Sequence, residues 1–144
     1  MIEPDTIKLL RECDAGIKMG VDSIEDVLDR VKDEKLQSCL SESRSKHENL
    51  ASEINVLLEK YHDDGKDPSV MAQGMSWMKT NMKLAMNESD RVIAGLITDG
   101  CNMGIKSLHK YLNQYQAASE QAKSITKQLI HLEEKLAEDL QTFL

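Results

Sequence analysis

The sequence contains few residues that interrupt helices and few that build disulfide or metal frameworks. Only two prolines occur in 144 residues, and proline is the residue that most strongly breaks a helix, because it lacks an N–H group and clashes with the preceding turn. Three cysteines, an odd number at wide spacings, form neither a disulfide framework nor a CxxC metal signature. We therefore expect long helices and reduced thiols.

Positive charge in excess and long apolar runs are also missing. The formal net charge is −7, which disfavours nucleic acid as a partner because phosphate binding depends on Lys and Arg. No apolar run approaches the roughly 20 residues that span a membrane. The amino terminus opens with acid rather than with a basic region and an apolar run. We expect a cytoplasmic protein that binds neither nucleic acid nor a membrane.

The residues that are present suit one folded helical domain. Hydrophobic residues make up 40% of the chain and charged residues 30%, which is enough to bury a core without disulfide or metal. Apolar residues recur at spacings of three and four, with no sustained strict alternation. The pattern predicts an all-α single domain over residues 1–144, with helices over residues 4–31, 36–61, 88–114 and 118–143.

Between the second and third of these helices lies a long crossover. Gly65 and Pro68 predict a loop, and methionines at helical spacing then predict a short helix over residues 70–86. Methionine is flexible and polarisable, so this helix offers a candidate surface for a partner or an apolar ligand; an ordinary core position is the alternative that we favour for these methionines. The candidate surface comprises Met71, Met75, Trp77, Met78 and Met82.

Residues 16–28 and 100–112 nearly repeat each other at a constant offset of 84, from Gly16 to Gly100 and from Leu28 to Leu112. Each stretch carries two glycines four residues apart, Gly16 with Gly20 and Gly100 with Gly104. Each glycine costs about 1 kcal/mol of helix propensity. We expect close packing of the helices to offset that cost, with room for a ligand as the alternative.

This repeat predicts two related hairpins. Short turns after the first and third helices predict that each hairpin is antiparallel, and the long crossover is expected to leave the third helix parallel to the first. The chain also carries a set of residues in a characteristic order: Gly16, 31–34, 65–68, Trp77, Lys79 and 100–111. On these residues it resembles, across nearly its whole length, the uncharacterised bacterial four-helix-bundle proteins of the ferritin-like superfamily. The resemblance implies a ferritin-like four-helix bundle.

The same resemblance implies a di-iron carboxylate site, built from a Glu of two helices and a Glu-x-x-His of the other two. This chain does not supply that set. Ile17 and Cys101 occupy equivalent interior positions where carboxylates are expected, and the stretches 44–47 and 128–131 end in histidine without the glutamate. We therefore expect no metal and no cofactor.

His47 lies on the apolar stripe of its helix, level with Gly20, whereas His131 lies off the stripe of its own helix. We expect His47 to be a buried, hydrogen-bonded imidazole packed where Gly20 lacks a side chain. A mixed zinc site of Cys13, His47 and Cys101 is the alternative, although Cys13 lies a turn or two from the His47 layer.

The acidic runs, residues 22–33 and 133–139, are interpreted as solvated helix faces. No phosphate loop, HExxH motif or nucleophile elbow occurs, so we expect no enzyme. The first hypothesis is a non-catalytic bundle acting through protein contacts, as a homo-oligomer or with another protein. The second is a divergent ferritin-like metal-binding or oxidative-stress protein. The third is a carrier of a small apolar ligand, held in a cavity near Gly20 and Gly104.

Overall fold

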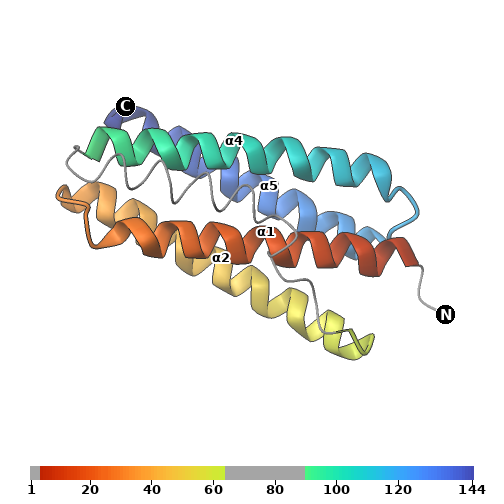
Figure 1. Ribbon diagram of the computed structural model, residues 1–144. Helices are drawn as coiled ribbons and strands as arrows, with labels where there is room; N and C mark the ends of the chain where they lie inside the picture. The colour runs from red at the N-terminus through yellow and green to blue at the C-terminus, as the bar shows by residue number, and fades with distance from the viewer. Residues whose placement is uncertain (1–3, 64–89) are drawn as a thin grey trace.

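The computed structural model describes residues 4–63 and 90–144, and in these ranges every regular element is helical. The described residues form four long helices, which Figure 1 shows packed side by side, so the prediction of an all-α four-helix bundle is confirmed. The elements are α1 (Pro4–Leu28), α2 (Glu34–Lys60), α4 (Asp90–Gln114), α5 (Glu120–Leu140) and the short 3-10 helix η2 (Gln141–Phe143).

Parts of the prediction lie outside the described residues. These are the short helix over residues 70–86, the first two residues of the predicted 88–114 helix, and the whole candidate surface of Met71, Met75, Trp77, Met78 and Met82. Within the described residues, the predicted end at Gln114 is confirmed.

The start of α1 at Pro4 also agrees with the prediction, whereas the remaining helix boundaries differ from it. Helix α1 ends at Leu28 rather than at Val31. Asp33 caps α2, since its carboxylate accepts the N–H groups of Lys35 and Leu36, and α2 therefore begins two residues before the predicted position 36. It ends at Lys60, one residue before the predicted position 61.

The last helix is shorter at both ends than predicted. Ser119 caps α5 by accepting the N–H of Ala122, so α5 begins at Glu120 instead of position 118. Regular α-helix ends at Leu140, and the final residues form η2 instead of continuing the helix to position 143.

Contacts at the two ends of the bundle show how α1 and α4 run. At one end, the Thr6 hydroxyl accepts the N–H of Ser119 (2.8 Å). At the other end, the Asp90 carboxylate accepts the N–H groups of Lys32 (2.9 Å) and Asp33 (2.8 Å). The start of each helix therefore lies beside the end of the other.

The expectation that the third helix runs parallel to the first is therefore wrong: α4 runs antiparallel to α1, and Figure 1 shows it running in the direction of α2. The physical reason is that α2 ends beside the start of α1, whereas α4 begins beside the end of α1. A helix that starts there and packs along the bundle must run opposite to α1.

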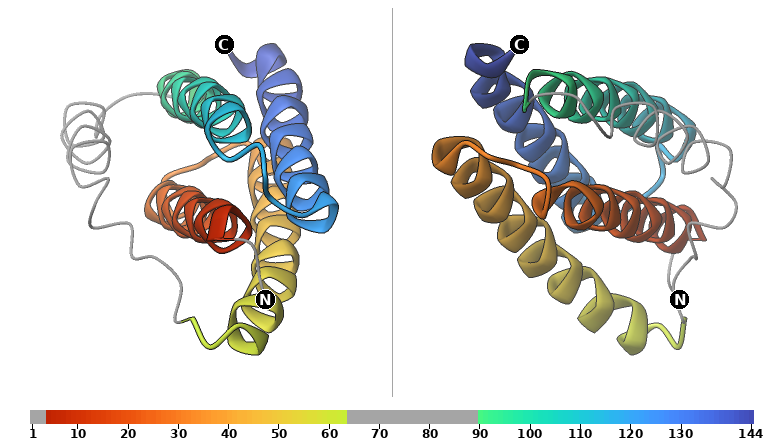
Figure 2. Two further views of the ribbon diagram at one scale, coloured as in Figure 1. Left: turned by 90° about the vertical axis from the view of Figure 1, so that its right-hand side faces the viewer. Right: turned by 60° about the vertical axis from the view of Figure 1, so that its left-hand side comes forward.

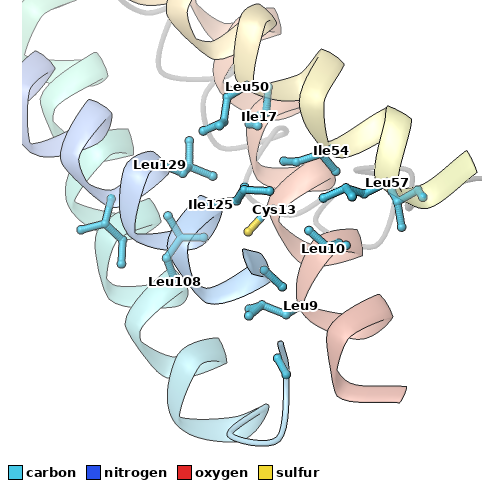
Figure 3. Close-up of a cluster of buried hydrophobic side chains, with 14 residues drawn as sticks. Leu9, Leu10, Cys13, Ile17, Leu50, Ile54, Leu57, Leu108, Ile125 and Leu129 are labelled. Atoms are coloured by element: carbon cyan, nitrogen blue, oxygen red, sulfur yellow. The ribbon is translucent and has the colours of Figure 1, made fainter. Parts of the chain in front are cut away.

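Viewed toward one end, the bundle has two layers, with α1 and α4 on one side and α2 and α5 on the other (Figure 2). Two apolar clusters form the core. Figure 3 shows the first, in which side chains from all four helices point toward one another. Its labelled members are Leu9, Leu10, Cys13, Ile17, Leu50, Ile54, Leu57, Leu108, Ile125 and Leu129.

The second cluster lies toward the other end of the bundle, and a different kind of layer separates the two. Its members include Ile24, Leu40, Cys101 and Leu136. Each helix contributes to this layer one residue that lies between its members of the first cluster and its members of the second. These residues are Gly20 on α1, His47 on α2, Gly104 on α4 and Glu133 on α5.

Candidate functional site

The layer between the two apolar clusters is built around His47 and Glu133. Helix α2 places His47 in the interior, where it is 1% exposed, and α5 brings Glu133 against it with Nε2 and Oε1 2.8 Å apart. The Nδ1 atom lies 2.7 Å from the backbone carbonyl of Ser43, one turn earlier. A carbonyl only accepts, so Nδ1 carries a proton and donates it. The prediction of a buried, hydrogen-bonded His47 is confirmed.

Glu133 also controls the charge of the imidazole. Burial lowers the pKa of His47, but the hydrogen bond and negative charge of Glu133, with the Ser43 carbonyl, outweigh burial and raise it above its usual 6.5. Below that raised pKa, both ring nitrogens of His47 donate, one to Ser43 and one to Glu133. The pair is then an imidazolium and a carboxylate whose charges cancel.

Cys101 on α4 also contacts the Glu133 carboxylate. Burial raises the pKa of the Cys101 thiol well above its ordinary range, and the charge and hydrogen bond of Glu133 raise it further. The thiol therefore stays protonated and donates to the Glu133 carboxylate. A protonated buried thiol is a poor nucleophile and a poor metal ligand, because both roles need the thiolate.

Sequence reasoning missed Glu133. The interpretation of residues 133–139 as a solvated helix face is wrong for this residue, whose side chain is 13% exposed. Its spacing gave a signal, because Glu133 follows Leu129 by four residues and precedes Leu136 by three. By contrast, His131 is exposed, as its position off the stripe predicted.

Gly20 and Gly104 are the other two members of this layer. A Cβ atom added at Gly20 would lie 3.7 Å from the His47 ring and 3.9 Å from Oε1 of Glu133, and one added at Gly104 would lie 3.7 Å from Oε2 of Glu133. These are ordinary contact distances. At Gly16 and Gly100, no heavy atom of the described residues would lie within 4 Å.

Close packing therefore does not explain these glycines. Each lies inside a regular helix, and among the described residues none of the four positions is too tight for alanine. The interpretation that close approach of the helices offsets their cost gains no support from the described residues. The alternative interpretation, room for a ligand, remains.

A cavity of about 90 Å³ lies beside these glycines, between α1 and α4, with His47 and Glu133 among its lining residues. Because α1 and α4 are antiparallel, Gly16 and Gly100 lie one turn to opposite sides of the Glu133 layer. The space therefore extends along the bundle in both directions from Glu133.

A second polar contact lines the same cavity. Burial raises the pKa of Tyr111 on α4, and the charge of Glu12 on α1 and the hydrogen bond between them raise it further. The phenol therefore stays neutral and donates to the Glu12 carboxylate. Apart from Glu12, the ionisable groups lining the cavity in the described ranges are His47, Glu133, Cys101 and Tyr111.

The three metal candidates do not come together. His47 and Cys101 both contact Glu133, whereas the Cys13 sulfur lies 3.2 Å from the Thr126 hydroxyl in the neighbouring apolar cluster. Burial raises the pKa of Cys13 to about 11. Across residues 4–63 and 90–144, no group of three or more His, Cys, Asp or Glu side chains could hold a metal ion.

The donor set around Glu133 does not fit the di-iron centre that the ferritin-like resemblance implies. Such a centre needs several carboxylates and free imidazole nitrogens. Here one carboxylate is present, the His47 nitrogens contact Ser43 and Glu133, and Cys101 is a protonated thiol.

Comparison of the chain with protein-family models, curated proteins and solved structures finds no match. Among the described helices, none combines the length and the apolar character needed to cross a membrane. What the cavity can bind follows from its shape and from the charges around it.

Proposed function

We propose that this helical bundle is a non-catalytic binding protein for a small, largely apolar molecule held in the cavity between α1 and α4. The observation that carries the proposal is the set of four glycines beside the cavity. Glycine inside a helix costs roughly 0.5–1 kcal/mol relative to alanine, and among the described residues alanine would meet no closer than ordinary contacts there. The glycines therefore lower the stability of their helices and leave space beside the cavity.

The remaining lining supports a binding role. Small-molecule sites are concave and mostly apolar, with a few polar groups that fix the orientation of the ligand. This cavity combines apolar side chains such as Ile24, Ile97 and Leu129 with a small number of polar groups, His47 and Glu133 among them. Its volume of about 90 Å³ is of the same order as the roughly 150 Å³ apolar cavity that binds benzene in an engineered protein.

A non-catalytic role fits the state of the polar groups. The Cys101 thiol stays protonated because its pKa is raised, and His47 uses both ring nitrogens in contacts with Ser43 and Glu133. Neither group is therefore available as an activated nucleophile or as a free general base.

We also propose that the two halves form antiparallel hairpins in a ferritin-like arrangement. Thr6 and Asp90, 84 residues apart, support this. Each lies in the first turn of the leading helix of its half, and each accepts the N–H of the residue that caps the second helix of the other half, Ser119 or Asp33. Two related hairpins would form the same kind of contact at positions separated by the repeat offset.

The other expectations stay predictions. The donor set around Glu133 favours neither a metal-binding nor an oxidative-stress function. Self-association gains no particular support from the surface of the described residues, whose large exposed hydrophobic side chains lie on different parts of the bundle: Val56 (66% exposed), Met103 (52%) and Leu144 (55%). A cytoplasmic location is likewise still a prediction.

Titration with three ring compounds of matched size tests the proposed function. Cyclopentane, cyclopentanone and cyclopentanol are added separately to ¹⁵N-labelled protein, and the backbone amide signals of Gly20, Gly100 and Gly104 are followed. We expect saturable shifts with at least one compound. No saturable shift with any of the three would contradict the proposal.

Two leucine variants on the same helix provide the matched control. Gly100 lines the cavity and Gly95 does not, yet a Cβ atom at either position meets no heavy atom of the described residues within 4 Å. We expect Gly100→Leu to abolish the saturable shifts and Gly95→Leu to preserve them. Equal binding by both variants would place the ligand elsewhere.

A further inference from the structure

The carboxylate of Glu133 has acceptor capacity that its protein contacts do not use. An ionised carboxylate offers about four lone-pair sites. His47 occupies one at Oε1, and the Cys101 thiol takes another. The second oxygen, Oε2, lies on the Gly104 side, 3.7 Å from where a Cβ atom would be. An acceptor therefore faces the space that the missing side chain leaves.

The charges around that acceptor favour an uncharged ligand. The imidazolium of His47 already balances Glu133, and Cys101 and Tyr111 stay neutral. In the described residues, neither Lys nor Arg lines the cavity, so an anion would meet the carboxylates of Glu12 and Glu133 without a second cation. A cation would lose its hydration in a largely apolar space, beside a carboxylate that His47 already pairs.

The donor and acceptor roles in this hydrogen bond restrict the class of ligand further. An ionised carboxylate can only accept, so a ligand group that also only accepts, such as a ketone, would place two oxygen lone pairs against each other. A hydroxyl or amide N–H would donate to Oε2 and form a charge-assisted hydrogen bond, which is stronger than a bond between neutral groups.

We infer that the ligand of this cavity is an uncharged molecule with a small apolar body and one hydroxyl or N–H donor, bound by Oε2 of Glu133 between Gly20 and Gly104. This inference rests on the proposed function, because it names the ligand class of the same cavity. His47 is a positioning residue here: it holds the Glu133 carboxylate in place and balances its charge.

The affinities of four probes for the full chain test the inference. Dissociation constants are measured by NMR titration at pH 6 for cyclopentanol, cyclopentanone, cyclopentane and protonated cyclopentylamine. We expect cyclopentanol to bind tighter than cyclopentanone by about tenfold or more, because a hydrogen bond to a charged group is gained and an unsatisfied acceptor is avoided. Cyclopentane and the amine are expected to bind more weakly than the alcohol.

Each alternative outcome has a separate meaning. Binding of none of the probes would overturn the proposed function together with this inference. Equal affinity for the alcohol, the ketone and the hydrocarbon would leave the cavity as a binding site and overturn the role of Glu133. Tightest binding by cyclopentylammonium would overturn the uncharged class, and tightest binding by the ketone would overturn the donor.

A spectroscopic measurement tests the same contact without a substitution. The ¹³C signal of the Glu133 side-chain carboxyl should move when cyclopentanol saturates the protein, and should move much less with cyclopentane. Saturation by cyclopentanol with an unmoved Glu133 carboxyl signal would overturn the inference.

A matched pair of variants adds an independent readout. Glu133→Gln keeps an acceptor but removes its charge, so the preference for cyclopentanol over cyclopentanone should fall several-fold. Glu134→Gln, at the exposed neighbouring position, should preserve the preference. An unchanged preference in folded Glu133→Gln would overturn the contact.

Discussion

Glu133 on α5 binds His47 on α2 across the interior of the bundle, with 2.8 Å between Oε1 and Nε2. This contact lies between the two apolar clusters of the core. Buried charge is tolerated only where a partner compensates for it. The pair therefore has consequences for stability, for pH dependence and for what the adjoining cavity accepts.

Replacing Glu133 with leucine should destabilise the protein strongly. Breaking a buried ion pair leaves the remaining charge without compensation, at a cost of about 3 kcal/mol or more. Glu134→Leu, at the exposed neighbouring position, should change the free energy of unfolding by less than about 0.5 kcal/mol. Urea denaturation of both variants measures the difference, and equal effects would show that Glu133 is not held in the interior.

The stability contributed by His47 should decrease as the pH rises. The pKa of His47 is raised in the folded protein above the usual 6.5, so the folded state binds the proton more tightly than the unfolded chain. This contribution is complete below the unfolded-state pKa and is lost as the pH passes through the folded-state pKa.

Comparison of wild type with His47→Gln by urea denaturation between pH 5 and pH 9 measures that loss. The advantage of the wild type should shrink above pH 6.5, and the His47 ring signals in NMR should titrate with a midpoint above 6.5. A midpoint below 6.5 would contradict the ion pair.

Alanine at Gly16 should stabilise the protein. A Cβ atom there meets no heavy atom of the described residues within 4 Å, and alanine is favoured over glycine in a helix by about 0.5–1 kcal/mol. Gly95→Ala, at a position equally open but away from the cavity, should stabilise by a similar amount. A loss of stability in Gly16→Ala alone would restore close packing as the reason for the glycine.

The contacts of Thr6 and Asp90 should each contribute to stability. Thr6→Val leaves the N–H of Ser119 without its acceptor, and Asp90→Ala does the same to Lys32 and Asp33. We expect about 1–2 kcal/mol for each substitution, and near-additivity in the double variant because the contacts lie at opposite ends. Thermal and urea denaturation, with exposed Asp99→Ala as the control, measure the effects. A loss of stability no larger than that of Asp99→Ala would show that these contacts do not contribute.

Much of this fold could be predicted from the sequence because helical periodicity is a local property. The four long helices follow from apolar residues at spacings of three and four, and so does the buried position of His47. The helix boundaries were less predictable, since Asp33 and Ser119 set them through capping hydrogen bonds. The pattern of apolar residues carries no information about those hydrogen bonds.

The site could be predicted only in part, because its central contact joins residues 86 apart in sequence. Glu133 stands in an acidic run, and an acid is usually solvated unless a partner compensates for it. That partner, His47, is on another helix. The glycines were visible in the sequence, but only the structure shows that no heavy atom of the described residues lies too close for alanine there.

The most direct test of the central claim is a crystal structure of the protein grown with cyclopentanol. The proposed binding site predicts ring density between Gly20 and Gly104, with the hydroxyl within hydrogen-bond distance of Oε2 of Glu133. Ring density elsewhere in the molecule, or none between Gly20 and Gly104 at a saturating concentration of cyclopentanol, would contradict it.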